Sequence, residues 1–216
     1  MRTLFRTSCM AVLALVFATP GLAQYGSSNG GGPVGTISSE LASASAAAAL
    51  AYKEGLRSVR RGQGYDAQAL KASTPEKADK AHERAQSAYR ESISALVRAI
   101  TVQPNLSKAW YYLGFADSQL GNYEEALTAY TKVLGLNPSD QDAREGRAEV
   151  YLSLNQIDEA KSAYTDLSRD SKSLANDLLS TMRRWIESRR QDAQGVDPAD
   201  IEAFAKWMDA RAASTG

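Results

Sequence analysis

The chain has 216 residues, with 25 basic and 25 acidic side chains, one Cys and one His. This balance excludes a nucleic-acid binder that works through a strong positive field. A zinc or iron–sulfur site built from protein ligands would need more Cys and His than the chain holds. Apolar residues make up 44% of the chain, which is enough for a core of ordinary size.

Residues 1–23 differ from the rest, because Arg2 and Arg6 precede an apolar run and no acidic residue occurs among them. The run is about half the roughly 20 residues needed to cross a bilayer. Gly21 and Ala23 are small residues at the two positions that a signal peptidase reads. The pattern predicts a secretory signal peptide, and therefore a periplasmic or secreted protein with no stable membrane insertion after cleavage.

Residues 24–37 are rich in Gly and Ser, and they predict a flexible leader. The chain then looks helical, with an Ala-rich first segment that Gly62 and its neighbours are expected to break. Thr74 and Pro75 predict the start of a second helix that runs to Val102. We expect these two helices to form a long antiparallel hairpin.

The chain contains a repeat, because sliding it against itself sets Asn122–Tyr130 over the similar stretch Gln156–Tyr164. The middle copy spans residues 107–140 and the third spans 141–174, while the hairpin segment 38–106 includes a degenerate first copy. In the last copy Arg144 replaces a Trp, and that copy is the weaker match. The middle copy has these residues at the repeat positions: Trp110, Leu113, Gly114, Ala126, Tyr130 and Pro138.

This spacing resembles the tetratricopeptide-repeat family. The opening of the hairpin, Tyr52-Lys-Glu-Gly55 with Arg57, Arg60 and Arg61, is similar to that of a group of exported bacterial members of the family. The resemblance implies an all-α solenoid of helical hairpins, to which the sequence adds a long N-terminal helical hairpin and a C-terminal two-helix cap. Gly114 and Ala126 are then structural, because only small side chains let the helices of a hairpin cross closely.

Residues 175–216 are expected to form the two capping helices, since a stripe of apolar residues recurs there at helical spacing. A dimer seam that uses Trp185 or Trp207 is the alternative.

The sequence offers no residues arranged for catalysis. His82-Glu83 lacks the second histidine of a zincin helix, and neither a nucleophile elbow nor a phosphate-binding loop is present. We therefore expect a protein that is not an enzyme and that uses no cofactor and no metal.

In tetratricopeptide proteins the first helix of each repeat lines a concave surface that binds segments of partner proteins. The resemblance places a partner-binding set there: Lys108, Tyr111, Phe115, Ser118, Glu145 and Glu149, with Asp142 and Leu152 beside them. Alternatively, Tyr111 and Phe115 pack against the N-terminal hairpin.

These features predict a non-enzymatic adaptor or assembly factor of the bacterial cell envelope. Its partner is another protein or a peptide segment, and no nucleic acid is expected. The alternative function is a structural homo-oligomer that associates through its C-terminal helices.

Overall fold

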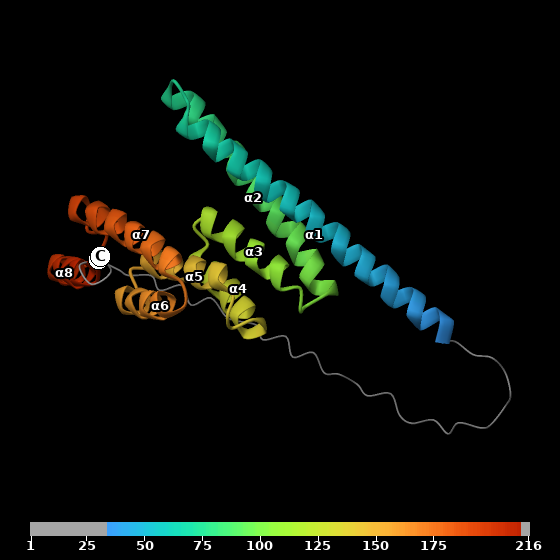
Figure 1. The fold of residues 1–216 in the computed structure, drawn as a ribbon. Coiled ribbons are helices and arrows are strands. Elements are labelled where there is room, and N and C mark those ends of the chain that lie inside the picture. Colours follow the sequence, from blue (N-terminus) through green and yellow to red (C-terminus); the bar gives the residue numbers. More distant parts are fainter. Residues whose placement is uncertain (1–33, 213–216) are drawn as a thin grey trace, which may run out of the picture. The chain divides into compact units, whose positions relative to one another are not determined.

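The computed structural model describes residues 34–212, with side chains from residue 42 to residue 211. All eight elements in this part of the chain are α-helices (Figure 1). They are α1 (Val34–Leu70), α2 (Pro75–Val102), α3 (Ser107–Gln119), α4 (Tyr123–Leu136), α5 (Gln141–Ser153), α6 (Ile157–Asp170), α7 (Lys172–Gln191) and α8 (Pro198–Ala212). The expected all-α fold is confirmed for these residues, and the predicted signal peptide lies outside them. Each helix of this described range is too short or too polar to span a bilayer.

The first helix is longer than the sequence predicts. α1 begins at Val34, inside the predicted leader, and it runs through Gly62 without the predicted break. A Cβ atom on Gly62 would lie 2.6 Å from Cε1 of Tyr89, and one on Gly55 would lie 2.6 Å from Cγ of Leu96. Both glycines therefore let α1 and α2 approach closely. This packing compensates for the helix propensity that each glycine loses, about 1 kcal/mol.

The start of α2 agrees with the sequence. Thr74 is its N-cap, with the Thr74 side chain accepting a hydrogen bond from the Lys77 backbone N–H at 3.4 Å. Pro75 occupies the first helical position, where its missing N–H costs nothing. Across the hairpin, the Tyr89 hydroxyl donates to Asp66 of α1 at 2.5 Å.

Tyr130 of α4 fills the expected helix crossing. A Cβ on Gly114 of α3 would lie 3.2 Å from the Tyr130 ring, and Ala126 of the same crossing is fully buried. A Cβ on Gly146 of α5, in the next repeat, would lie 2.6 Å from Cζ of the same ring. The ring is therefore held between two successive hairpins, and the predicted structural role of Gly114, Ala126 and Tyr130 is confirmed.

Equivalent hydrogen bonds tie each hairpin to the turn before it. The Trp110 indole N–H donates to the Pro104 carbonyl at 2.8 Å. Arg144, at the same repeat position, donates to the Pro138 carbonyl at 2.8 and 3.0 Å. Arg144 thus keeps the hydrogen bond of the tryptophan that it replaces.

The turns inside the two repeats also match. Gly121 has φ +78°, and Asn155, at the equivalent position of the next repeat, has φ +60°. Both residues adopt the left-handed conformation, which glycine reaches freely and asparagine tolerates better than most residues.

α7 and α8 form the expected C-terminal cap. α7 begins at Lys172, inside the predicted third repeat, because Ser171 ends α6 and also caps α7. The Trp185 ring of α7 lies 5.6 Å from Phe204, and the Trp207 ring of α8 lies 5.5 Å from Tyr164. Both tryptophans therefore contact the core of their own chain.

Candidate functional site

The first helices of the hairpins, α3, α5 and α7, form one continuous surface because α5 contacts both of the others. Several acidic side chains interact across them. We name this set the first-helix surface, which consists of Tyr111 from α3, Asp142, Glu145 and Glu149 from α5, and Asp177, Thr181 and Arg184 from α7.

Tyr111 marks one end of this surface. Its ring is half-buried, 5.2 Å from the Tyr112 ring and 5.9 Å from the Tyr130 ring. Burial, and then the charges of nearby carboxylates such as Asp142 and Glu145, raise the pKa of Tyr111 to about 12. The ring is therefore fixed by its neighbours, stays neutral at physiological pH, and lies beside carboxylates.

Glu145 and Glu149 lie in the middle of the surface. Partial burial raises the pKa of Glu145 first, and the charges of Glu149, Asp177 and Asp142 then raise it further. Burial also raises the pKa of Glu149, although the residue as a whole is exposed to solvent. An exposed carboxylate that is still surrounded by protein atoms is typical of a recessed surface, where like charges repel more strongly than on a flat one.

α7 supplies the other side of the surface. The Thr181 hydroxyl donates to Glu149 at 3.5 Å, and Arg184 donates to Thr181 at 2.9 Å. These neighbours oppose the rise in the pKa of Glu149. No cation is among the groups that shift the pKa of Glu145.

The remaining predicted site residues are placed differently. Phe115 is half-buried, and its ring lies 6.0 Å from the ring of Tyr89 of α2. Phe115 therefore packs against the N-terminal hairpin, as the alternative prediction for it states. The Ser118 hydroxyl donates to the Phe115 carbonyl at 2.8 Å. Lys108 is exposed in the first turn of α3. Leu152 is buried in the core, where its carbonyl accepts a hydrogen bond from the Trp185 indole at 2.6 Å.

The sequence pattern does not assign Asp177, Thr181 and Arg184 to the site. A fixed repeat period would start α7 at position 175, but α7 begins at Lys172, because only Ser171 connects it to α6. The repeat therefore cannot align α7 with the earlier first helices. Ser171 is a recognisable N-cap, since its hydroxyl accepts a backbone N–H of the first turn at 3.4 Å, and it is the one signal that gives the correct start.

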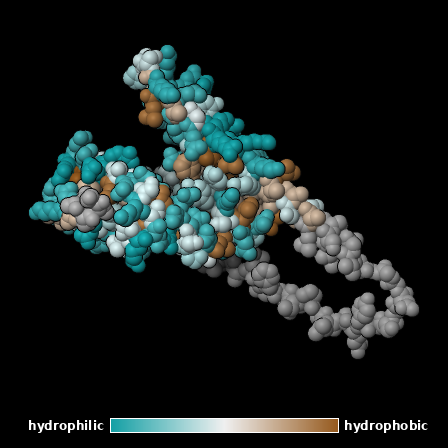
Figure 2. Space-filling view, in the orientation of Figure 1, coloured by the Kyte–Doolittle hydropathy of each residue, from teal (hydrophilic) through white to brown (hydrophobic). Residues whose placement is uncertain are grey.

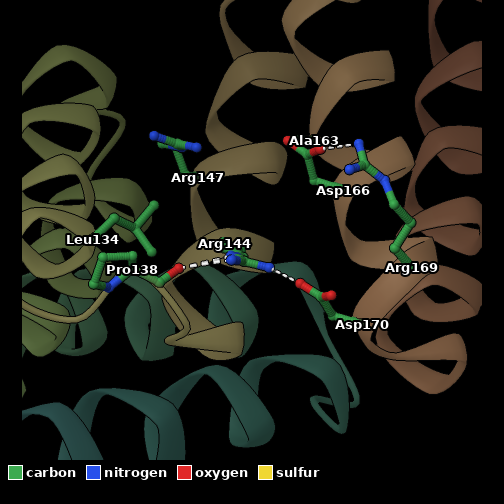
Figure 3. Close-up of a pocket in the computed structure, with 8 residues that line it drawn as sticks. All are labelled: Leu134, Pro138, Arg144, Arg147, Ala163, Asp166, Arg169 and Asp170. Atoms are coloured by element: carbon green, nitrogen blue, oxygen red, sulfur yellow. Dashed lines mark hydrogen bonds and ion pairs between the residues drawn. The ribbon is translucent and has the colours of Figure 1, made fainter.

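A cleft of about 400 Å³, separate from the first-helix surface, lies between the end of α4 and helices α5 and α6 (Figure 3). Three arginines and two aspartates line it. Arg144 pairs with Asp170, and Arg169 pairs with Asp166 at 2.6 Å. The third arginine packs over the Tyr151 ring at 5.8 Å. Since most of its charges are paired within the chain, this cleft serves chiefly to join the repeats.

Two sequence comparisons agree with the repeat pattern. A family model described as tetratricopeptide repeat matches residues 117–178, which include Glu145 and Glu149. A TPR repeat-containing protein of Methanocaldococcus jannaschii is 31% identical over 86 residues, which are 40% of this chain and only 15% of that protein. A crystal structure of a thermophilic TPR protein in Thermus thermophilus aligns with a TM-score of 0.45 and 21% identity, over 69% of this chain and 74% of that chain.

Proposed function

We propose that this chain, whose residues 117–178 match a tetratricopeptide-repeat family model, is a non-enzymatic adaptor or assembly factor that binds a segment of a partner protein on its first-helix surface. The partner segment carries basic side chains. The proposed site of action is the bacterial cell envelope, and the signal peptide that the sequence predicts over residues 1–23 supports it.

The observation that carries this proposal is the clustering of carboxylates from two helices. Partial burial raises the pKa of Glu145 most, and the charges of Glu149, Asp177 and Asp142 raise it further, so like charges repel within this cluster. Such repulsion lowers the stability of the free protein. A Lys or Arg of a partner would relieve it, so the surface is better suited to a cationic segment than to water alone.

Tyr111 adds an apolar contact at the edge of the same surface. Aromatic side chains are frequent among the residues that contribute most to protein interfaces. The ring is already held by Tyr112 and Tyr130, so little conformational freedom would be lost on binding. We therefore expect a partner segment that places an apolar residue on Tyr111 and a basic residue near Glu145.

Crosslinking in the cell envelope tests this function. The tagged protein is crosslinked, and the captured proteins are compared between the wild type and a Glu145→Gln/Glu149→Gln variant. Glu124→Gln/Glu125→Gln is the matched control, because it removes the same charge from exposed positions on α4. The partner should bind the first variant about tenfold more weakly, which corresponds to about 1.4 kcal/mol, and should bind the control as it binds the wild type.

Equal capture by both variants would contradict the proposal. Measurement of the molecular mass in solution at several dilutions tests the alternative function, a structural homo-oligomer. An adaptor stays monomeric until its partner is added, whereas the mass of a stable oligomer persists on dilution.

A further inference from the structure

A cationic cleft of about 410 Å³ lies at the turn between α1 and α2, outside the first-helix surface. Four of its lining residues are basic and none is acidic. The basic residues are Lys71, Lys77, Lys80 and Arg84. A cavity lined by this many cations is suited to an anionic group.

The arrangement of α2 keeps the acidic side chains of this helix out of the cleft. Lys77, Lys80 and Arg84 follow one another at helical spacing and therefore share one face. The acidic residues of this stretch each precede one of these cations directly, so they occupy the neighbouring face. Ion pairs described for residues 42–211 join none of the four basic side chains of the cleft to a carboxylate.

Contacts within the hairpin position two of these cations. The Lys77 ammonium donates to Ser73 Oγ at 3.2 Å, and the Arg84 guanidinium lies 5.9 Å from the centroid of the Tyr65 ring. Neither contact neutralises a positive charge. The N-terminal end of α2 lies in the same region, and its helix dipole adds further positive potential.

A large apolar side chain is exposed at the end of α1. Leu70, the last residue of α1, is 87% exposed and directly precedes Lys71. Figure 2 shows hydrophobic atoms among hydrophilic ones at this end of the hairpin. An exposed leucine adds nothing to the binding of a small soluble anion, but beside several lysines it suits a lipid surface, where the headgroups are anionic and the layer beneath them is apolar.

We propose that the α1–α2 turn docks on an anionic phospholipid surface. Lipid phosphate groups occupy the cleft, and the Leu70 side chain enters the headgroup layer. This peripheral contact does not depend on partner binding, since it uses a different part of the chain.

Sedimentation with vesicles tests the proposal. The wild-type protein should bind vesicles of phosphatidylglycerol mixed with phosphatidylcholine, and it should not bind phosphatidylcholine vesicles. Each basic residue near an anionic surface contributes about fivefold in affinity. A variant with Lys71, Lys77, Lys80 and Arg84 all changed to Gln should therefore lose at least about a hundredfold, and Leu70→Ser should weaken binding by about tenfold.

The matched control removes four exposed cations from elsewhere in the chain: Lys53→Gln, Arg57→Gln, Lys132→Gln and Arg183→Gln. All variants have the same N-terminal residues. A difference in vesicle binding between the two quadruple variants therefore reports on the cleft. Circular dichroism checks that both remain folded. Equal loss in both variants, equal binding to the two kinds of vesicle, or tighter binding to inorganic phosphate than to vesicles would overturn the proposal.

Discussion

The Tyr130 ring shows how single residues determine the stacking of the repeats. Gly114 and Gly146 both pack closely against the ring, and the ring itself is almost fully buried. Gly114 occupies a repeat position, and its role follows from the repeat pattern. Gly146 occupies no repeat position, since Ala148 is the residue equivalent to Gly114 in the next repeat. The close contact of Gly146 with Tyr130 could therefore be found only in three dimensions.

Gly146→Ala should destabilise the protein even though alanine is the better helix former. The added methyl group would lie 2.6 Å from Cζ of Tyr130, and the ring has little room to move because it is buried and also packs closely against Gly114. Overpacking of this kind costs about 1–3 kcal/mol, which exceeds the gain of about 1 kcal/mol in helix propensity. Urea denaturation measures the difference.

Gly64→Ala is the matched control, because a Cβ on Gly64 would meet no atom within 4 Å. This change should stabilise the protein by up to about 1 kcal/mol. If both changes stabilise the protein, the described packing of Tyr130 is wrong.

The carboxylate of Glu145 should lower the stability of the free protein at neutral pH. Its pKa is raised above the ordinary value of 4.5, so the folded chain binds the proton more tightly than the unfolded chain does. The stability that this group contributes is therefore complete below pH 4.5 and is lost as the pH rises through the raised pKa. Glu145→Gln should accordingly raise the free energy of unfolding at pH 7 by about 0.5 kcal/mol, a small effect because water screens the partly exposed charge.

Denaturation at pH 7 and at pH 4 measures this effect. The gain from Glu145→Gln should disappear at the lower pH, where the wild-type carboxyl group is protonated. A variant that is less stable than the wild type at pH 7 would show that Glu145 forms a favourable ion pair, and the first-helix surface would then not be suited to a cationic partner.

At the scale of the helices, Trp110 and Arg144 perform the same task with different chemistry. Each donates a hydrogen bond to a proline carbonyl in the turn that precedes its own hairpin. Arg144→Ala should therefore cost about 1 kcal/mol. Arg144→Trp should recover most of that loss, since the exposed ion pair with Asp170 contributes little by itself. Thermal denaturation compares the two variants, and equal melting temperatures would contradict the equivalence of Trp110 and Arg144.

Patterns within one helix or one repeat predict most of this architecture. Thr74 and Pro75 mark the start of α2, and Gly114, Ala126 and Tyr130 mark the crossing of α3 and α4, because these features depend on local geometry. The unbroken course of α1 could not be predicted in this way.

Gly62 looks like a helix breaker in the sequence, and only its contact with Tyr89 of α2 explains why the helix continues. For the same reason the candidate site was only half predicted. Tyr111, Glu145 and Glu149 follow from the repeat, whereas the α7 residues of the first-helix surface depend on the short connection between α6 and α7.

On the scale of the whole chain, charge is segregated although the net charge is zero. The first-helix surface is acidic, and the α1–α2 turn is basic. A balanced total therefore conceals two surfaces that favour different binding partners, a basic protein segment for the first and an anionic lipid surface for the second.

Export predicts a defined N-terminus. If the signal peptide is cleaved after Ala23, the mature protein begins at Gln24 and loses both Arg2 and Arg6, which leaves 23 basic and 25 acidic side chains. Mass spectrometry of the protein from an envelope fraction should give the mass of residues 24–216. An intact Met1 would contradict cleavage.

Site-specific photocrosslinking in the envelope tests the partner-binding surface most directly. A photoreactive residue replaces Glu149 or Thr181 on the first-helix surface, and for comparison Glu124 of α4 or Asp158 of α6, which are exposed on second helices. We predict adducts with one partner protein from positions 149 and 181 and none from 124 and 158. Adducts from 124 and 158 alone would show that the partner binds the opposite helices.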